Sequence, residues 1–169
     1  MFAELVRNTL NYSNQDFISI DKELSFLKVY LQLEKLRFGE MFNYSIQFNE
    51  KEYLEVPSLI IQPFIENALV HGLMHRAGKK ELHIVFSLTD RVLQCTITDN
   101  GVGRKKADEI GNRQGNHHES FALRAIKKRL EIFKKQYSEN IGYIIEDLYE
   151  NEVAIGTKVI LTMPFKKRF

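Results

Sequence analysis

Two pairs of segments with alternating apolar and polar residues constrain the fold of this chain most strongly. ELHIVFSLT is followed, after a tight turn at 89–91, by RVLQCTIT, and GYIIEDLY is followed shortly by TKVILTM. Such alternation is typical of β-strands that bury one face and expose the other. Strands paired in this way favour a mostly antiparallel sheet, which needs helices on one face only.

Helical periodicity precedes, separates and follows these strands. Ser19 or Asp21 could cap a helix that reaches about Phe38 and ends at Gly39. Further helices are expected at about 58–74 and 121–137, and one more strand at MFNYSIQF. This order of elements predicts an α+β fold, a two-layer sandwich in which about three helices cover one face of a mixed, mostly antiparallel sheet.

Length and composition favour a single soluble domain. The 169 residues, 44% of them hydrophobic, can form one well-buried core. The 24 basic and 22 acidic side chains leave a net charge of +2, so no nucleic-acid partner is expected. No apolar run approaches the roughly 20 residues that cross a bilayer, and no signal peptide is evident. Cys95 is the only cysteine, which favours a reduced, cytoplasmic setting without an internal disulfide.

The stretch PFIENALVHG carries polar side chains within an otherwise apolar helix. Asn67 and His71 are four residues apart and therefore share a helix face. An amide oxygen is a suitable Mg²⁺ ligand when the ion also binds substrate phosphates, and His71 could donate a hydrogen bond to a phosphate oxygen. The alternative is that Asn67 is a buried amide with protein partners and that His71 is an ordinary, partly exposed histidine.

A second candidate, TDNGVG, lies at the end of a predicted strand. Gly101 and Gly103 can adopt positive φ and let the backbone approach a ligand closely. Asp99 is a carboxylate fixed at the strand end and could accept the exocyclic N–H of adenine; the alternative is an ordinary Asp-Asn-Gly turn. The polar segment 104–119 has almost nothing to bury and is expected to be a mobile surface loop.

Together these motifs resemble the ATP-binding domain of the Bergerat-fold, or GHKL, family. IIQPFIENALVHG is similar to its N box, DNGVG to its G1 box and GTKVILTMP to its terminal glycine box. Within that family the chain most resembles the LytS/YehU-type sensor histidine kinases, because SIDKELSFLKVYLQLEKLRFG is also similar to the segment before their N box. The resemblance implies a Bergerat-fold catalytic domain that binds ATP and Mg²⁺.

The resemblance also implies roles for individual residues. Asn67 would ligate the Mg²⁺ between the ATP phosphates, with His71 near those phosphates. Glu66, the third implied catalytic residue, would orient a water or the Mg²⁺, or have a structural role, since neighbouring helix positions point about 100° apart. The segment 104–119 would be the ATP lid. The implied nucleotide contacts are Asn67, His71, Asp99 at adenine, Gly101, Gly103, Ser120, Leu123 and Thr157, the last through its hydroxyl or a water.

One segment departs from the family pattern. Where the family has G-x-G-L-x-N after the lid, this chain has SFALRA, with Ser120 and Ala122 at the glycine positions. Arg129 and Leu130 still match the R-L that follows. Glycines there let backbone amides at a helix N-terminus meet phosphate oxygens, so their loss is expected to weaken triphosphate binding. Ser120 could cap the following helix.

The resemblance also divides the chain and implies its partners. Residues 1–18 would be the end of a dimerisation helix, since MFAELVRNTLNYS has helical periodicity without a preceding cap, and 19–169 would be the catalytic domain. The phosphoacceptor of the family lies in a PHF-type motif, which none of the five histidines here has.

The expected partners are therefore a dimerisation and phosphoacceptor domain and a response regulator. The domain would lie on the cytoplasmic side, within a membrane-associated homodimer that is anchored in the inner membrane. Two alternatives are a nucleotide-responsive interaction module with decayed kinase activity and another GHKL-type ATPase.

Overall fold

The computed structural model describes residues 1–49, 53–89, 91–113, 121–138 and 140–167. Its helices are α1 (Phe2–Ser13), α2 (Ile20–Phe38), the 3-10 helix η1 (Gly39–Met41), α3 (Gln62–Asn67), the π-helix η2 (Ala68–Leu73), α4 (Arg104–Arg113) and α5 (Phe121–Gln136). Its strands are β1 (Phe17–Ser19), β2 (Phe42–Gln47), β3 (Leu54–Pro57), β4 (Lys80–Leu88), β5 (Leu93–Asp99), β6 (Gly142–Glu150), β7 (Val153–Met163) and β8 (Lys166–Lys167). Among these residues, no helix combines the length and apolar character that a membrane span requires.

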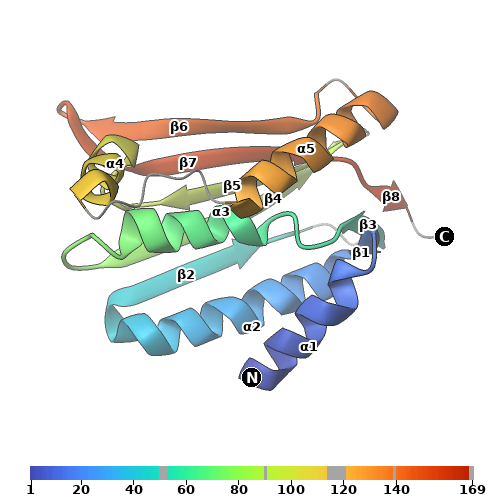
Figure 1. Cartoon of the computed structure of the whole chain (residues 1–169), viewed down its shortest axis with the longest axis horizontal. Coiled ribbons are helices and arrows are strands. Elements are labelled where there is room, and N and C mark those ends of the chain that lie inside the picture. Colours follow the sequence, from blue (N-terminus) through green and yellow to red (C-terminus); the bar gives the residue numbers. More distant parts are fainter. Residues whose placement is uncertain (50–52, 90, 114–120, 139, 168–169) are drawn as a thin grey trace.

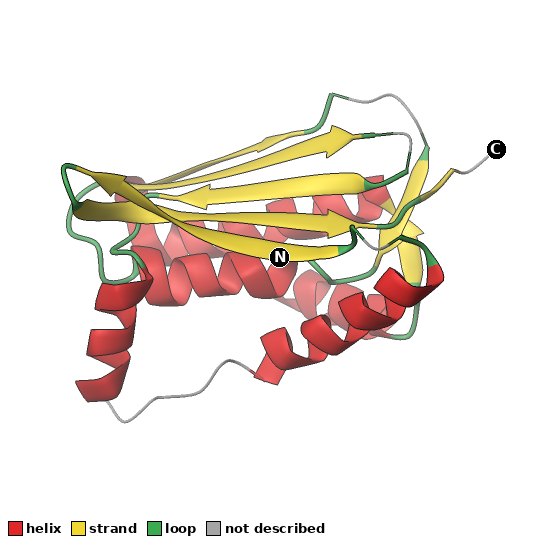
Figure 2. Cartoon of the chain, turned by 90° about the horizontal axis from the view of Figure 1, so that it is seen from above, coloured by secondary structure: helices red, strands yellow, loops and turns green. Residues whose placement is uncertain are grey.

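A five-stranded sheet forms one layer of the molecule. Its strands lie in the order β2-β4-β5-β7-β6; β2 runs parallel to β4, and the other neighbours are antiparallel. The helices α2, α3 and α5 run across the same side of this sheet (Figure 1). Figure 2, seen from above, shows the helices gathered on one face. The predicted two-layer α+β sandwich with a mixed, mostly antiparallel sheet is therefore confirmed.

Residue alternation decides which side chains of the sheet reach the helices. On β5, Leu93, Cys95 and Ile97 are buried, whereas the residues between them are half-buried. Side chains two positions apart point to the same face, so Asp99, the last residue of β5, continues this buried row. The apolar core therefore ends in a carboxylate at the carboxyl end of a central strand.

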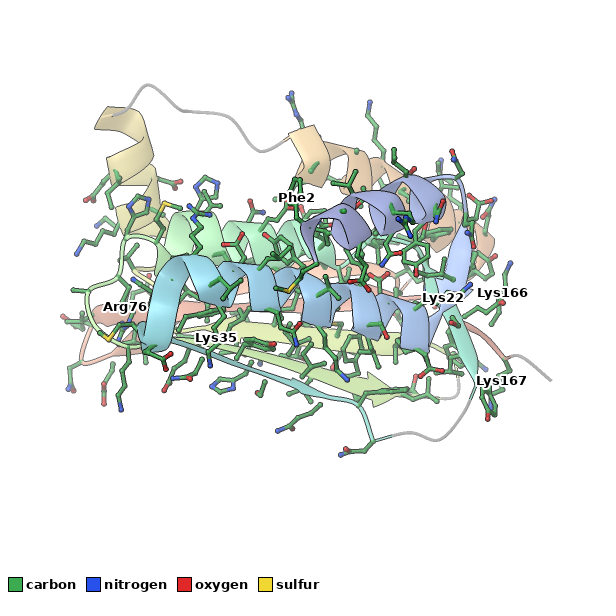
Figure 3. All side chains as sticks on the ribbon, turned by 90° about the horizontal axis from the view of Figure 1, so that it is seen from below. Phe2, Lys22, Lys35, Arg76, Lys166 and Lys167 are labelled. Carbon is green, nitrogen blue, oxygen red and sulfur yellow. The ribbon has the colours of Figure 1, made fainter. Side chains whose placement is uncertain are left out.

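A second, three-stranded sheet with the order β1-β3-β8 lies at one end of the molecule. The residue pattern does not predict this sheet, because strands of two to four residues are too short to show alternation. Figure 3 labels Lys22, Lys166 and Lys167 at this end, and the Lys166 ammonium nitrogen lies 4.0 Å from the centre of the Phe17 ring. β8 thus brings the end of the described chain next to the connection between α1 and α2.

Local signals set the ends of α2 as predicted. The Ser19 hydroxyl oxygen accepts a hydrogen bond from the Lys22 N–H (3.4 Å), so Ser19 rather than Asp21 is the cap. Gly39 follows the last residue of α2 with φ +71°, a conformation that residues with a side chain rarely adopt. α5 also matches its predicted range, ending one residue earlier than expected.

The helix predicted at 58–74 begins later than expected. Residues 58–61 form a turn, and α3 begins only at Gln62. In this turn Leu59 has φ +52°, and its N–H donates to a carboxylate oxygen of Glu23 in α2 (3.3 Å). A contact between distant segments therefore overrides the helical pattern of the local sequence, and periodicity could not reveal it.

The second half of that helix is wider than an α-helix. Ala68–Leu73 form η2, and the Met74 N–H donates to the Leu69 carbonyl (2.8 Å), five residues back. Such π-turns are rare and occur frequently at functional sites. The predicted helix thus consists of one α-helical and one π-helical part.

The prediction of a surface loop at 104–119 is wrong for Arg104–Arg113, which form the helix α4. The segment is so polar that it shows no apolar periodicity, although Lys, Ala and Glu readily enter helices. Residues 114–120 lie outside the described residues. β7 also begins earlier than predicted, at Val153 instead of Thr157.

Candidate functional site

The Asp99 carboxylate is the centre of the candidate site. The residue is 3% exposed, and its Oδ1 accepts a hydrogen bond from the Gly101 N–H (2.7 Å). Its Oδ2 accepts a hydrogen bond from the hydroxyl of Thr157 on β7 (2.6 Å), the residue that pairs with it across the sheet. Burial raises the pKa of Asp99, while the hydrogen bonds from Thr157 and Gly101 act to lower it. The carboxylate is thus held in one orientation, and its lone pairs can accept further donors.

Two glycines bring η2 into direct contact with the segment after Asp99. A Cβ on Gly101 would lie 2.5 Å from the Gly72 Cα, and a Cβ on Gly72 would lie 2.9 Å from Asp99 Oδ1. The Val102 N–H also donates to the Gly72 carbonyl (3.3 Å). A side chain at either glycine would push η2 away from the carboxylate.

The glycines of DNGVG have different structural roles. Gly103 has φ +77°, as predicted, and a Cβ there would also approach the Cβ of Ala154 to 2.7 Å. The prediction of a positive φ does not hold for Gly101, which is not among the residues with positive φ. Its lack of a side chain is required by the proximity of Gly72 instead.

Asn67 and His71 lie on the α3–η2 helix, one at the end of α3 and the other within η2. Asn67 is half-buried and His71 is exposed. Among the residues that the structure describes, neither side chain makes a hydrogen bond. Asn67 is therefore not fully buried, whereas the exposed His71 agrees with the alternative of an ordinary histidine.

Glu66 has a different environment from its neighbour Asn67. Its Oε1 accepts a hydrogen bond from the side-chain amide of Gln62, one turn earlier (2.7 Å). Burial raises the pKa of Glu66, and the nearby carboxylate of Glu34 on α2 raises it further. Glu66 is thus oriented by Gln62 on the side of α3 that faces α2.

The segment after α4 is described only in part. Leu123, an expected nucleotide contact, is 8% exposed and belongs to the hydrophobic core. Ser120, expected near the phosphates and as a helix cap, lies outside the described residues. The structure therefore describes α5 but not the segment that leads into it.

The fold brings most of the expected residues to one region. η2 contacts α4 and the strands β4, β5 and β7, so the helix that carries Asn67 and His71 ends against Asp99 and Thr157. Gly72 and Gln62 were not singled out from the sequence, although both belong to the motif IIQPFIENALVHG. Within the described ranges, no three His, Cys, Asp or Glu residues form a group that could hold a metal ion.

Comparison with known proteins gives consistent matches. A family model described as "Histidine kinase" matches residues 1–42. The sensor protein LytS of Staphylococcus saprophyticus is 28% identical over 173 residues, which cover 96% of this chain and 27% of LytS. The chain therefore spans about a quarter of the length of this curated relative.

Solved structures with a similar fold include histidine kinases. The histidine kinase domain of a blue-light activated kinase from Erythrobacter litoralis EL346 has a TM-score of 0.55 at 16% identity, over 83% of this chain and 63% of that one. The histidine kinase ThkA, solved in complex with a response regulator, has a TM-score of 0.54 at 11% identity, over 96% of this chain and 47% of that one.

Sequence similarity and fold thus agree with each other and with the motifs around Asp99 and Asn67. The chain is thus a homologue of LytS sensor histidine kinases and has the fold of a histidine kinase catalytic domain.

Proposed function

We propose that this chain binds ATP with Mg²⁺ and positions it for phosphoryl transfer to a histidine of a dimerisation domain outside these residues. The observation that carries this proposal is the buried Asp99 carboxylate, fixed by Gly101 and Thr157 where η2 meets the sheet. A buried, oriented carboxylate at the end of the helix that carries the half-buried Asn67 amide suits a ligand with a hydrogen-bond donor at one end and charged oxygens at the other.

Asp99 would recognise adenine through the exocyclic amino group. Its protein partners are all donors, so the carboxylate is presented as an acceptor, and adenine N6–H₂ is a donor. Guanine has a carbonyl oxygen at the corresponding position, which would face the carboxylate without a proton between them. The Thr157 hydroxyl, which donates to Asp99, can accept a hydrogen bond from the base edge or from a bridging water.

The α3–η2 helix would bind the phosphates. The side-chain oxygen of Asn67 suits a hard cation that prefers oxygen ligands and is shared with phosphate oxygens. Bound Mg²⁺ would neutralise charge on the phosphates during transfer. His71 would donate to a phosphate oxygen, and the backbone between Gly101 and Gly103 would pass close to the nucleotide.

Three further residues would support this site. Glu66, oriented by Gln62, would hold a water near the phosphates or fix α3 against α2. Leu123 would act through the packing of α5, since it is buried. Ser120 would cap α5 and lie near the phosphates.

The proposed partners are a phosphoacceptor domain on a dimerisation helix and a response regulator. We place the domain boundary near residue 18, with α1 as the end of the dimerisation helix, and we place the domain on the cytoplasmic side of a membrane-associated homodimer. The ThkA structure, which contains a response regulator, supports such a partner by analogy of fold.

Titration calorimetry with MgATP and MgGTP tests the proposal. ATP should bind more tightly than GTP, and Asp99→Ala should weaken ATP binding by roughly 1.5–3 kcal/mol, about ten- to a hundredfold, because a charged hydrogen bond is lost from a buried site. Equal affinities for the two nucleotides, or an unchanged affinity after Asp99→Ala, would refute the adenine assignment.

A further inference from the structure

A bidentate ion pair joins the start of α4 to the sheet. Arg104, the first residue of α4, donates from Nε to Asp147 Oδ1 (3.0 Å) and from Nη2 to Asp147 Oδ2 (2.8 Å). The backbone N–H of Arg104 also points to Asp147 Oδ1 (3.4 Å). A guanidinium that meets both oxygens of a carboxylate fixes direction as well as distance.

Asp147 belongs to the same cross-strand row as Asp99. Thr157 on β7 pairs with Asp99 on one side and with Asp147 of β6 on the other. Residues directly opposite each other in a sheet point to the same face, so both carboxylates lie on the face that the helices cover. The side chain of Asp147 is 20% exposed and that of Arg104 51%, so the carboxylate is the more enclosed partner.

The backbone from residue 99 to residue 104 is therefore held at both ends by this row. Asp99 accepts the Gly101 N–H at one end, and Asp147 holds Arg104 at the other. Between them Gly103 adopts φ +77° against Ala154 of β7. The direction in which α4 leaves the sheet depends on both carboxylates.

We propose that Asp147 is a positioning residue for the phosphate side of the nucleotide site. Through Arg104 it fixes the first turn of α4, and α4 contacts η2, part of the helix that would bind the phosphates. Adenine recognition at Asp99 does not depend on it. This inference rests on the function proposed above.

The charges of the pair set the expected direction of the effect. The hydrogen bonds from Arg104 hold the pKa of Asp147 below its ordinary value, so the carboxylate is ionised at neutral pH. If Arg104 instead served as a phosphate ligand, Asp147 would compete with the phosphates, and neutralising Asp147 would strengthen ATP binding. The two roles of Arg104 therefore predict opposite signs.

The test compares ATP with adenosine, which lacks phosphates, by titration calorimetry on the whole chain. Asp147→Asn should weaken MgATP binding about three- to fivefold, the size expected for a partly exposed ion pair, and leave adenosine affinity unchanged. The exchange Arg104→Asp with Asp147→Arg should restore part of the loss, since it reverses the charges of the pair. Arg104→Lys keeps the charge but cannot make both bonds, and it should behave like Asp147→Asn.

A matched control lies next to Asp147 on the same strand. Glu146→Gln removes an ion pair with Lys158 (3.3 Å) on the other face of the sheet, away from α4. It should change the affinity for neither ligand. Thermal unfolding of each variant verifies that it is folded at the temperature of the titration. If Asp147→Asn is not folded at that temperature, Arg104→Lys takes its place in the comparison.

Three outcomes would overturn the inference. Equal losses for ATP and adenosine would mean general stabilisation, tighter ATP binding would make Arg104 a phosphate ligand, and unchanged ATP binding would leave Asp147 without a role. Asp99→Ala, measured in the same series, separates the two proposals. If it weakens binding while Asp147→Asn does not, only this inference fails; if neither does, the proposed function fails as well.

Discussion

At the scale of single residues, the Asn67 amide gives a direct test of the proposed Mg²⁺ ligand. Asn67→Ala should weaken MgATP binding about tenfold, because a coordinating oxygen is lost, and should leave adenosine binding unchanged. ATP titrated in excess EDTA should bind the variant and the original chain alike. Asn43→Ala, at an exposed position of β2, is the matched control and should alter none of these affinities. A variant that kept its full Mg²⁺ dependence would contradict the ligand assignment.

At the scale of elements, the buried Glu23 joins α2 to the turn before α3. One of its oxygens accepts the Leu59 N–H (3.3 Å), and burial raises its pKa from 4.5 to about 7. The folded chain therefore binds this proton more tightly than the unfolded chain does. From pH 4.5 to about 7 this carboxyl should lower the free energy of unfolding by on the order of 3 kcal/mol as the pH rises.

Urea denaturation near pH 5 and near pH 8 measures this effect. Glu23→Gln keeps an oxygen for the Leu59 N–H but cannot ionise, so its stability should rise relative to that of the original chain as the pH increases. Glu40→Gln, at an exposed position after α2, is the control and should follow the original chain. Parallel stability curves for Glu23→Gln and the original chain would rule out Glu23 as the titrating group.

The elements also show how far the sequence could predict the structure. Periodicity predicted α2, α5 and the long strands, and the motif resemblance singled out Asp99, Thr157 and Asn67. Neither periodicity nor the resemblance could predict the turn at Leu59 or the three-stranded sheet, because both depend on contacts between segments far apart in sequence. For the same reason the sequence does not identify Asp147 as a site residue, since its hydrogen-bond partner Arg104 lies 43 residues away in sequence.

At the scale of the whole molecule, the chain should bind ATP without phosphorylating itself. None of its five histidines lies in the acceptor motif of the family, so incubation with γ-labelled ATP should yield no acid-labile phosphate. Added to a protein that carries matching dimerisation helices, the chain should transfer phosphate weakly, because no tether raises the local concentration. Asp99→Ala should reduce that transfer, because it weakens ATP binding. Phosphohistidine within the isolated chain would contradict the proposed division of labour.

Asp99 and Thr157 pair although they lie 58 residues apart, so the two residues are synthesised at different times. Synthesis proceeds from the N-terminus, so β5 leaves the ribosome long before β7. Until β7 docks, β5 is the edge of a partial sheet with unpaired N–H and C=O groups, a form of strand that invites pairing with other chains. The carboxylate that would read adenine gains its second partner only when one of the last strands arrives. Nucleotide in the cell would then bind only the finished sheet and favour its completion by mass action.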